Sequence, residues 1–202
     1  METEKFNKWR ENYETMTLEE QIEFHNQIAK QYPEQAHYDY AAVSEIIDTF
    51  KPNSILEFGC WRADMAQQAL SQFDFIQTWT GIEICTEAMS MCRCSNNRFK
   101  YILPTKFNWF EDKRKYAADM ILATHFIEHL SNTHFEQLTK YCKGVSYIYF
   151  ECPIEEEGQG WEHDVSTHKL EYGWRDVIRL MNLQGYEVYK LHSRGITFEL
   201  AK

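Results

Sequence analysis

The feature that most constrains this chain is a regular alternation of short apolar strand patterns with amphipathic helix patterns. The first strand pattern is Ser54-Ile55-Leu56-Glu57-Phe58, which Gly59 ends. Further strand patterns follow at residues 79–84, 99–103, 118–123 and 145–150, with helical patterns between them. This spacing is typical of βαβ units, which place parallel strands in one sheet and helices on both of its faces. The sequence therefore predicts a three-layer α/β/α sandwich with a mainly parallel sheet.

Helical segments precede the first strand. Thr17-Leu18-Glu19-Glu20 predicts a capping box that starts a helix, and Pro33 ends that helix. Apolar residues at helical spacing predict a second helix over about residues 38–50. We interpret residues 1–50 as an N-terminal helical lid, although the same helices would equally suit the surface of a homodimer.

The chain closes on a helix and a hairpin. An apolar stripe starting at Trp174 predicts a helix that Gly185 ends as a C-cap. Residues 187–191 and 196–200 predict a terminal β-hairpin, which adds one antiparallel strand to the sheet. We therefore expect residues 51–202 to form the main domain.

Composition restricts the partners that suit this chain. It has 202 residues, 31 of them acidic and 21 basic, for a formal net charge of -10. Such a charge repels a phosphate backbone at long range, which disfavours nucleic acid and favours a small-molecule partner. Six cysteines without a Cys-x-x-Cys pair indicate reduced thiols in a cytoplasmic protein. No run of 18 apolar residues occurs, so we expect no membrane span.

Residues able to bind a nucleoside follow three of the expected strands. Ligands of an open parallel sheet bind beyond the carboxyl ends of its strands. Gly59 follows the first strand and lets the backbone turn tightly and approach a ligand. Glu83 ends the second strand, where its carboxylate can accept hydrogen bonds from both hydroxyls of a ribose. Thr124 and His125 follow the fourth strand at the same edge.

These motifs resemble those of the class I S-adenosylmethionine-dependent methyltransferases. The family's first-strand motif, acidic-x-Gly-x-Gly-x-Gly, is similar to the segment from Glu57 to Ala63. Its ribose-binding acid matches Glu83, and its fourth-strand motif, which often ends in Glu-His-Leu, matches residues 118–130. The match covers roughly residues 52–150 in order. It implies a Rossmann-like fold.

The resemblance also implies S-adenosyl-L-methionine as the cofactor. The residues that it assigns to cofactor binding are Glu57, Gly59, Cys60, Trp61, Ala63, Glu83, Ile84 and Thr124. Trp61 and Ala63 replace the second and third glycines of the family's loop. The Trp61 indole either points away from the methionine tail or packs against it. This departure leaves open an alternative, a regulatory protein that keeps the fold and has lost catalysis.

Two histidines are the candidate catalytic residues. His129 follows the fourth strand and His163 lies in a loop after the fifth. Either could take a proton from a hydroxyl acceptor as the methyl group transfers by direct displacement, although His129 could instead hydrogen-bond within its own loop. We interpret His125 as a pocket-lining or structural residue. The loop with His163 and His168 could also bind a divalent metal, but it lacks diagnostic spacing, so no metal site is predicted.

The acidic composition and the histidine-bearing loops favour O-methylation of a small polar acceptor, such as a sugar or a metabolite hydroxyl. The sequence does not identify that acceptor. A nucleic-acid or protein methyltransferase is the remaining alternative, although an Asn/Asp-Pro-Pro-Tyr/Phe motif is missing after the fourth strand.

Overall fold

The computed structural model describes residues 16–31, 39–103, 118–152, 170 and 172–201. The helices in these ranges are α2 (Leu18–Gln31), α3 (Tyr40–Phe50), α4 (Asp64–Gln72), α5 (Thr86–Ser90), the 3-10 helix η4 (Ile127–His129), α6 (Asn132–Cys142) and α7 (Trp174–Leu183). The strands are β1 (Ser54–Phe58), β2 (Thr78–Ile82), β3 (Phe99–Ile102), β4 (Met120–Thr124), β5 (Tyr147–Glu151), β6 (Tyr186–Leu191) and β7 (Gly195–Leu200).

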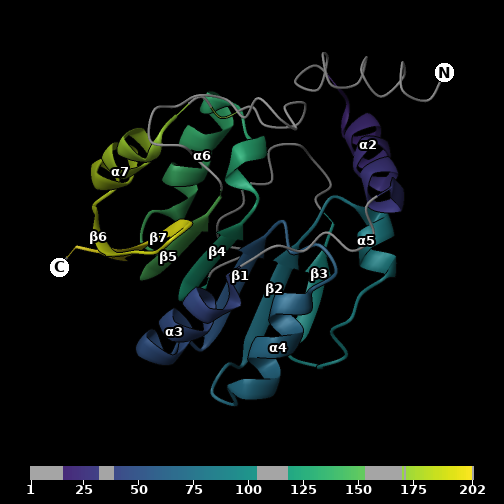
Figure 1. The fold of residues 1–202 in the computed structure, drawn as a ribbon, viewed down its shortest axis with the longest axis horizontal. Coiled ribbons are helices and arrows are strands. Elements are labelled where there is room, and N and C mark those ends of the chain that lie inside the picture. Colours follow the sequence, from purple (N-terminus) through teal and green to yellow (C-terminus); the bar gives the residue numbers. More distant parts are fainter. Residues whose placement is uncertain (1–15, 32–38, 104–117, 153–169, 171, 202) are drawn as a thin grey trace.

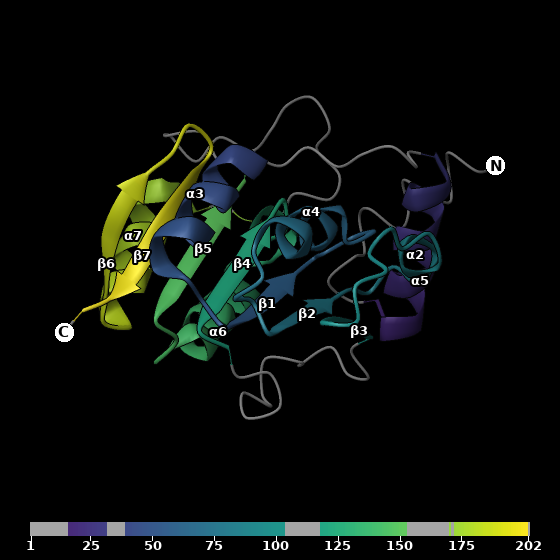
Figure 2. The same cartoon turned by 90° about the horizontal axis from the view of Figure 1, so that it is seen from below.

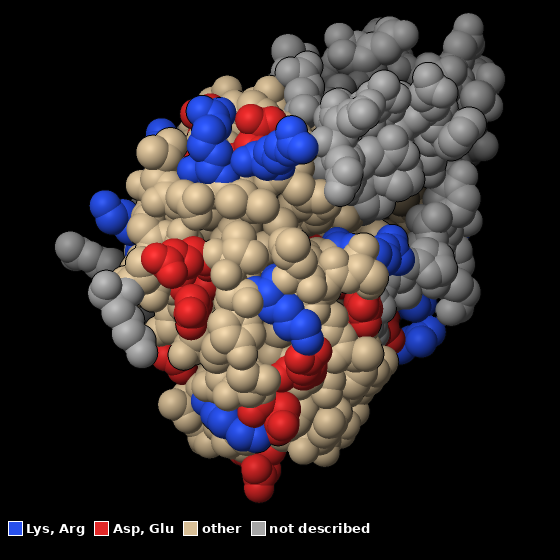
Figure 3. All heavy atoms as spheres, turned by 60° about the vertical axis from the view of Figure 1, so that its left-hand side comes forward, with Lys and Arg blue, Asp and Glu red and all other residues tan. Residues whose placement is uncertain are grey.

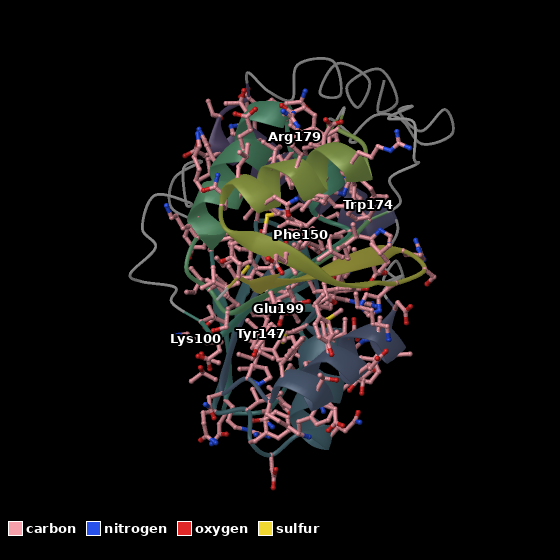
Figure 4. The ribbon with its side chains drawn as sticks, turned by 90° about the vertical axis from the view of Figure 1, so that its left-hand side faces the viewer. Lys100, Tyr147, Phe150, Trp174, Arg179 and Glu199 are labelled. Atoms are coloured by element: carbon pink, nitrogen blue, oxygen red, sulfur yellow. The ribbon has the colours of Figure 1, made fainter. Side chains whose placement is uncertain are left out.

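These strands form one sheet in the order β3-β2-β1-β4-β5-β7-β6 (Figure 1). Strands β1 to β5 pair in parallel, whereas β7 is antiparallel to both β5 and β6. The terminal hairpin thus inserts one antiparallel strand, as the sequence predicts. The register places Tyr147 opposite Glu199, and both are labelled in Figure 4.

Helices cover both faces of the sheet, which confirms the predicted three-layer sandwich (Figures 1 and 2). One apolar core joins the sheet to α3 and α4 through residues such as Val43, Ile47 and Leu70. A second core joins the other face to α6 and α7 through residues such as Leu138 and Val177. Alternate strand residues point to opposite faces, so each buried strand supplies both cores.

Helix α2 lies outside these layers, beside α5 at the β3 side of the sheet (Figures 1 and 2). The predicted capping box starts it. Thr17 N–H donates to Glu20 Oε2 at 2.7 Å, and Glu20 N–H donates to Thr17 Oγ1 at 3.2 Å. The second N-terminal helix, α3, packs against the sheet itself, and its Tyr40 hydroxyl donates to Gln72 of α4 at 2.9 Å. The lid role of residues 1–50 stays a prediction.

Element ends differ from the sequence prediction by a few residues, for local reasons. Helix α6 begins at Asn132, before its apolar stripe, because the Ser131 hydroxyl accepts from His134 N–H at 3.3 Å. Strand β4 begins at Met120 rather than residue 118. The Asp119 carboxylate accepts from Asn53 N–H and Ser54 N–H, which ties that residue to the start of β1. Within the described part of the chain, no helix has both the length and the apolar character that crossing a membrane requires.

Candidate functional site

The carboxyl ends of four parallel strands form the edge where the sequence predicts a site. In the sheet order β2-β1-β4-β5, the residues at or just after these ends are Glu83, Gly59, His125 and Glu151. Because β6 runs parallel to β5, the β6–β7 turn at residues 192–194 reaches the same edge. We call the ends of β1 and β2 the β1–β2 half of the edge. The ends of β4 and β5 with this turn are the β4–β5 half.

The glycine turn and the strand-end acid meet directly in the β1–β2 half. Glu83 Oε2 accepts from Trp61 N–H at 2.7 Å, and its Oε1 accepts from Cys85 N–H at 2.8 Å. The side chain is largely buried, with 5% of the residue exposed. Burial raises the pKa of Glu83 above its usual value, although the backbone hydrogen bonds of Cys85, Trp61 and Ile84 oppose the shift. The two motifs that the sequence assigns to a cofactor are therefore joined by a hydrogen bond.

The turn after β1 has left-handed backbone at all three positions where the family has glycine. Gly59, Trp61 and Ala63 have φ of 71°, 48° and 60°. A Cβ on Gly59 would lie 2.9 Å from Cδ2 of Phe126, so this position excludes larger residues on both conformation and space. Left-handed backbone costs a residue with a side chain about 1–2 kcal/mol. Trp61 and Ala63 thus keep the backbone of the glycine loop without its glycines.

The Trp61 side chain packs against a small cluster between α2 and α5. This cluster contains Ala29, Cys85 and Ala88. The indole Nε1 is buried and has no hydrogen-bond partner among the described residues. The Tyr101 hydroxyl donates to the Trp61 carbonyl at 2.6 Å, which holds the turn to β3. The indole is therefore packed on protein, while its position relative to a bound methionine tail stays a prediction.

The other cofactor-assigned residues surround this turn. Glu57 is 2% exposed and accepts from Trp79 Nε1 at 2.8 Å, so its side chain is held within the sheet layer. Burial raises the pKa of Glu57 to about 8. Cys60 and Thr124 are also buried, whereas Ile84 is partly exposed. The structure thus places all eight residues at the ends of β1, β2 and β4.

The β4–β5 half contains a cluster of titratable side chains centred on His125. Its Nδ1 lies 3.2 Å from Glu128 Oε1, and its Nε2 lies 3.3 Å from a guanidinium nitrogen of Arg194. Glu151 Oε1 lies 3.8 Å from the same Nε2. Sequence reasoning treats His125 only as a lining residue and does not single out Arg194. The i, i+3 spacing of His125 and Glu128 is the local signal that could have drawn attention to this pair.

Two buried carboxylates support this cluster. Glu151 has no exposed surface and accepts from Asp39 N–H at 2.9 and 3.1 Å and from the Tyr149 hydroxyl at 3.0 Å. Burial raises the pKa of Glu151, and these hydrogen bonds oppose the shift. Burial alone would also raise the pKa of Glu128. The hydrogen bond from His125 and the nearby His129 outweigh it, so the pKa of Glu128 lies below its usual value.

Of the two predicted catalytic histidines, the structure describes only His129, which lies close enough to Glu128 to lower the pKa of that carboxyl. His129 belongs to η4 and lies near His25 of α2. Burial and His129 together lower the pKa of His25 to about 3. His163 and the possible metal-binding residue His168 lie outside the described residues. Within the described ranges, no three His, Cys, Asp or Glu side chains are grouped so that they could hold a metal ion.

Comparisons with known proteins identify the fold. Neither protein-family models nor curated sequences give a match to this chain. Solved structures do. The methyltransferase domain of bacterial CtHen1-C has a TM-score of 0.64 and 13% identity over 81% of this chain and 97% of its own. Human N-acetylserotonin methyltransferase in complex with SAM has a TM-score of 0.63 and 13% identity, covering 92% of this chain and 57% of its own.

A third similar structure is an O-methyltransferase family protein from Burkholderia thailandensis. Its TM-score is 0.64 and its identity 8%, over 92% of this chain and 60% of that one. The chain therefore has the Rossmann-like fold of class I S-adenosylmethionine-dependent methyltransferases, as the sequence motifs predict.

Proposed function

We propose that this protein is an S-adenosyl-L-methionine-dependent methyltransferase that methylates a hydroxyl of a small polar acceptor. The observation that carries this proposal is the 2.7 Å hydrogen bond between Glu83 and the backbone of the glycine turn. It brings a strand-end carboxylate and a tight left-handed turn to one place on the carboxyl edge, where open α/β sheets bind nucleotides. The similar fold of a human methyltransferase in complex with SAM supports the same assignment.

The β1–β2 half fits an adenosyl group with a charged tail. Each Glu83 oxygen accepts one backbone hydrogen bond, and a carboxylate oxygen has room for a second, so two ribose hydroxyls can still donate. Helix α4 begins at Asp64, directly after the turn, and the N-cap residue before it, Ala63, makes no side-chain cap. Its backbone N–H groups therefore favour an anionic group at this position.

The β4–β5 half fits the methyl acceptor. When bound, the cofactor supplies a methyl group already activated by the positive sulfonium, so the chain mainly has to align the acceptor with it. His125, Glu128, Glu151 and Arg194 provide polar groups suited to a hydroxyl-bearing molecule. Acidic and basic side chains are interspersed on the described face in Figure 3, which suits a small acceptor better than a polyanion. A cytoplasmic location and a homodimer stay predictions.

Calorimetry tests this function. We expect the wild-type chain to bind S-adenosylmethionine and S-adenosylhomocysteine. Glu83→Ala should weaken binding by about 1.5–3 kcal/mol, or roughly 10- to 150-fold, because hydrogen bonds to a charged group are lost. Glu187→Ala on the exposed side of β6 is the matched control, since it removes the same charge far from the turn. Unchanged affinity in Glu83→Ala would show that the ribose is placed wrongly.

One observation favours a second candidate, a protein of this fold without catalysis. Trp61 occupies the second glycine position and directs a large side chain into the cluster between α2 and α5. Absence of measurable S-adenosylmethionine binding by the wild-type chain would favour this alternative over an enzyme.

A further inference from the structure

We propose that His125 takes the proton from the acceptor hydroxyl and that Glu128 positions it. The inference rests on the proposed function, because only methylation of a hydroxyl releases this proton. It assigns the proton to a residue that the sequence motifs leave without a chemical role. Four features of the β4–β5 half support this role.

The contact with Glu128 determines the tautomer of His125. Its Nδ1 lies 3.2 Å from Glu128 Oε1, and the Glu128 side chain is only 4% exposed. A carboxylate accepts hydrogen bonds and does not donate them, so the His125 Nδ1 carries the proton. The Nε2 atom then has a lone pair that can accept a hydrogen bond or a proton. A base whose far nitrogen is held by a buried carboxylate is the arrangement that activates hydroxyl groups in many enzymes.

The groups around Nε2 agree with this tautomer. A guanidinium nitrogen of Arg194 lies 3.3 Å away, and a guanidinium only donates. Nε2 is therefore the acceptor in this contact, which agrees with a proton on Nδ1. The Glu151 carboxylate, with Oε1 3.8 Å from the same Nε2, accepts instead from Asp39 N–H and the Tyr149 hydroxyl. Arg194 is exposed on the β6–β7 turn, so its side chain has room to move when an acceptor hydroxyl takes its place. The His125 side chain is 29% exposed, which makes the ring reachable.

The backbone at His125 has a strained, left-handed conformation. Its φ is 49°, a conformation that costs a non-glycine residue about 1–2 kcal/mol. The hydrogen bond from His125 N–H to the Glu151 carbonyl, 2.8 Å long, holds it there. Strain of this kind is concentrated at functional sites. Glu128 Oε2 is also buried without a hydrogen-bond partner among the described residues, so it can still accept from a bound molecule.

His125 also lies close, along the sheet edge, to the turn proposed to bind the cofactor. Strand β4 neighbours β1, so His125 directly follows the strand next to the glycine turn. His129 belongs to η4 and interacts with both Glu128 and His25 of α2. The His125 Nε2 lone pair takes the O–H proton while the acceptor oxygen bonds the methyl carbon. The carbon–sulfur bond breaks and its electron pair stays on sulfur. The imidazolium that results faces the Glu128 carboxylate, which stabilises its charge.

The tautomer can be tested without knowing the acceptor. Nitrogen-15 NMR of the histidine rings, with S-adenosylhomocysteine added to the full chain, should show the His125 proton on Nδ1 and a lone pair on Nε2. Glu128→Gln should mix the two tautomers, because an amide can donate as well as accept. His125→Asn identifies the signal. A wild-type His125 with its proton on Nε2 would overturn the proposal, because that atom could not then take another.

Turnover provides the second test. The probe is tritiated methyl transfer from S-adenosylmethionine to a defined pool of monosaccharides, hydroxy acids and phenols. His125→Asn should lower kcat about 100-fold or more with little change in the KM for S-adenosylmethionine. Asn tolerates a positive φ, and its amide can still donate to Glu128, so the loop stays in place. His134→Asn in α6 is the matched histidine control and should keep wild-type turnover.

The outcomes separate this inference from the proposed function. Full turnover by His125→Asn, or a comparable loss only in His129→Asn, would overturn the role of His125. A wild-type chain that binds S-adenosylmethionine but methylates no hydroxyl in the pool would also overturn the role of His125. The assignment of the β1–β2 half to the cofactor would then be retained. A wild-type chain that does not bind S-adenosylmethionine would overturn the proposed function itself.

Discussion

At the ends of β1 and β2 the backbone makes most of the polar contacts, whereas at the ends of β4 and β5 side chains make them. Glu83 is held by two backbone N–H groups in the first half. In the second half, His125 contacts the side chains of Glu128 and Arg194. Backbone geometry survives side-chain replacement, as Trp61 and Ala63 show at the glycine positions. The β1–β2 half is thus suited to one constant ligand, and the β4–β5 half can change with a few substitutions.

The largest effect should come from breaking the β1–β2 half at its turn. Gly59→Val puts a branched side chain at φ 71° and against Phe126, so we expect a loss of roughly 2–5 kcal/mol in unfolding free energy and no cofactor binding. Gly185→Val is the control. Its φ is 88°, but open space surrounds the added Cβ, so only the conformational cost remains. Urea unfolding measures the stability of both variants. An equal loss in the two would show that the contact with Phe126 does not contribute to the effect at Gly59.

The buried Glu57 should make stability depend on pH. Its pKa rises from 4.5 to about 8 in the folded chain, so folding favours the protonated carboxyl. That contribution is complete below about pH 4.5 and is lost as the pH rises through about 8. Glu57→Gln keeps an acceptor for Trp79 Nε1 without the charge. Between pH 5 and 8 the unfolding free energy should therefore fall less in this variant than in the wild-type chain. The difference between the two falls should be on the order of a few kcal/mol.

Urea titrations at several pH values measure this difference. The raised pKa values of Glu83 and Glu151 act in the same direction, so part of the slope should persist in the variant. An identical slope in the wild-type chain and Glu57→Gln would show that Glu57 is not the group responsible.

The smallest effect should come from loosening α2. Asn26 Oδ1 accepts from Glu87 N–H at 2.9 Å, which ties α2 to α5 beside the Trp61 cluster. Asn26→Ala should weaken S-adenosylmethionine binding by about 1 kcal/mol, roughly fivefold. Gln27→Ala on the same helix removes only a contact with Glu23, so it should bind as the wild-type chain does. Equal affinity of both variants in calorimetry would show that α2 does not act on the β1–β2 half.

The sequence predicts the fold and the β1–β2 half well because both depend on local signals. Strand β1 begins and ends at the predicted residues, and Gly185 follows α7 with the positive φ of a C-cap. Gly59 and Glu83 directly follow apolar strands, so their place at the carboxyl edge follows from the parallel topology.

The β4–β5 half was harder to predict because its contacts join residues far apart in the chain. Arg194 lies 69 positions after His125, and Asp39 lies 112 positions before Glu151. No local pattern specifies those pairs. The left-handed backbone of Trp61 was equally hidden, since a bulky residue does not favour it and only the surrounding structure imposes it.

The insertion of β7 between β5 and β6 has an evolutionary consequence. Strand β6 brings the chain to the carboxyl edge, and a short hairpin turn at that edge leads it into β7. A hairpin turn can lengthen, shorten or change its residues without shifting the five parallel strands. Under the proposed function, substitutions in this turn would let the choice of acceptor diverge among descendants while the ends of β1 and β2 are inherited unchanged.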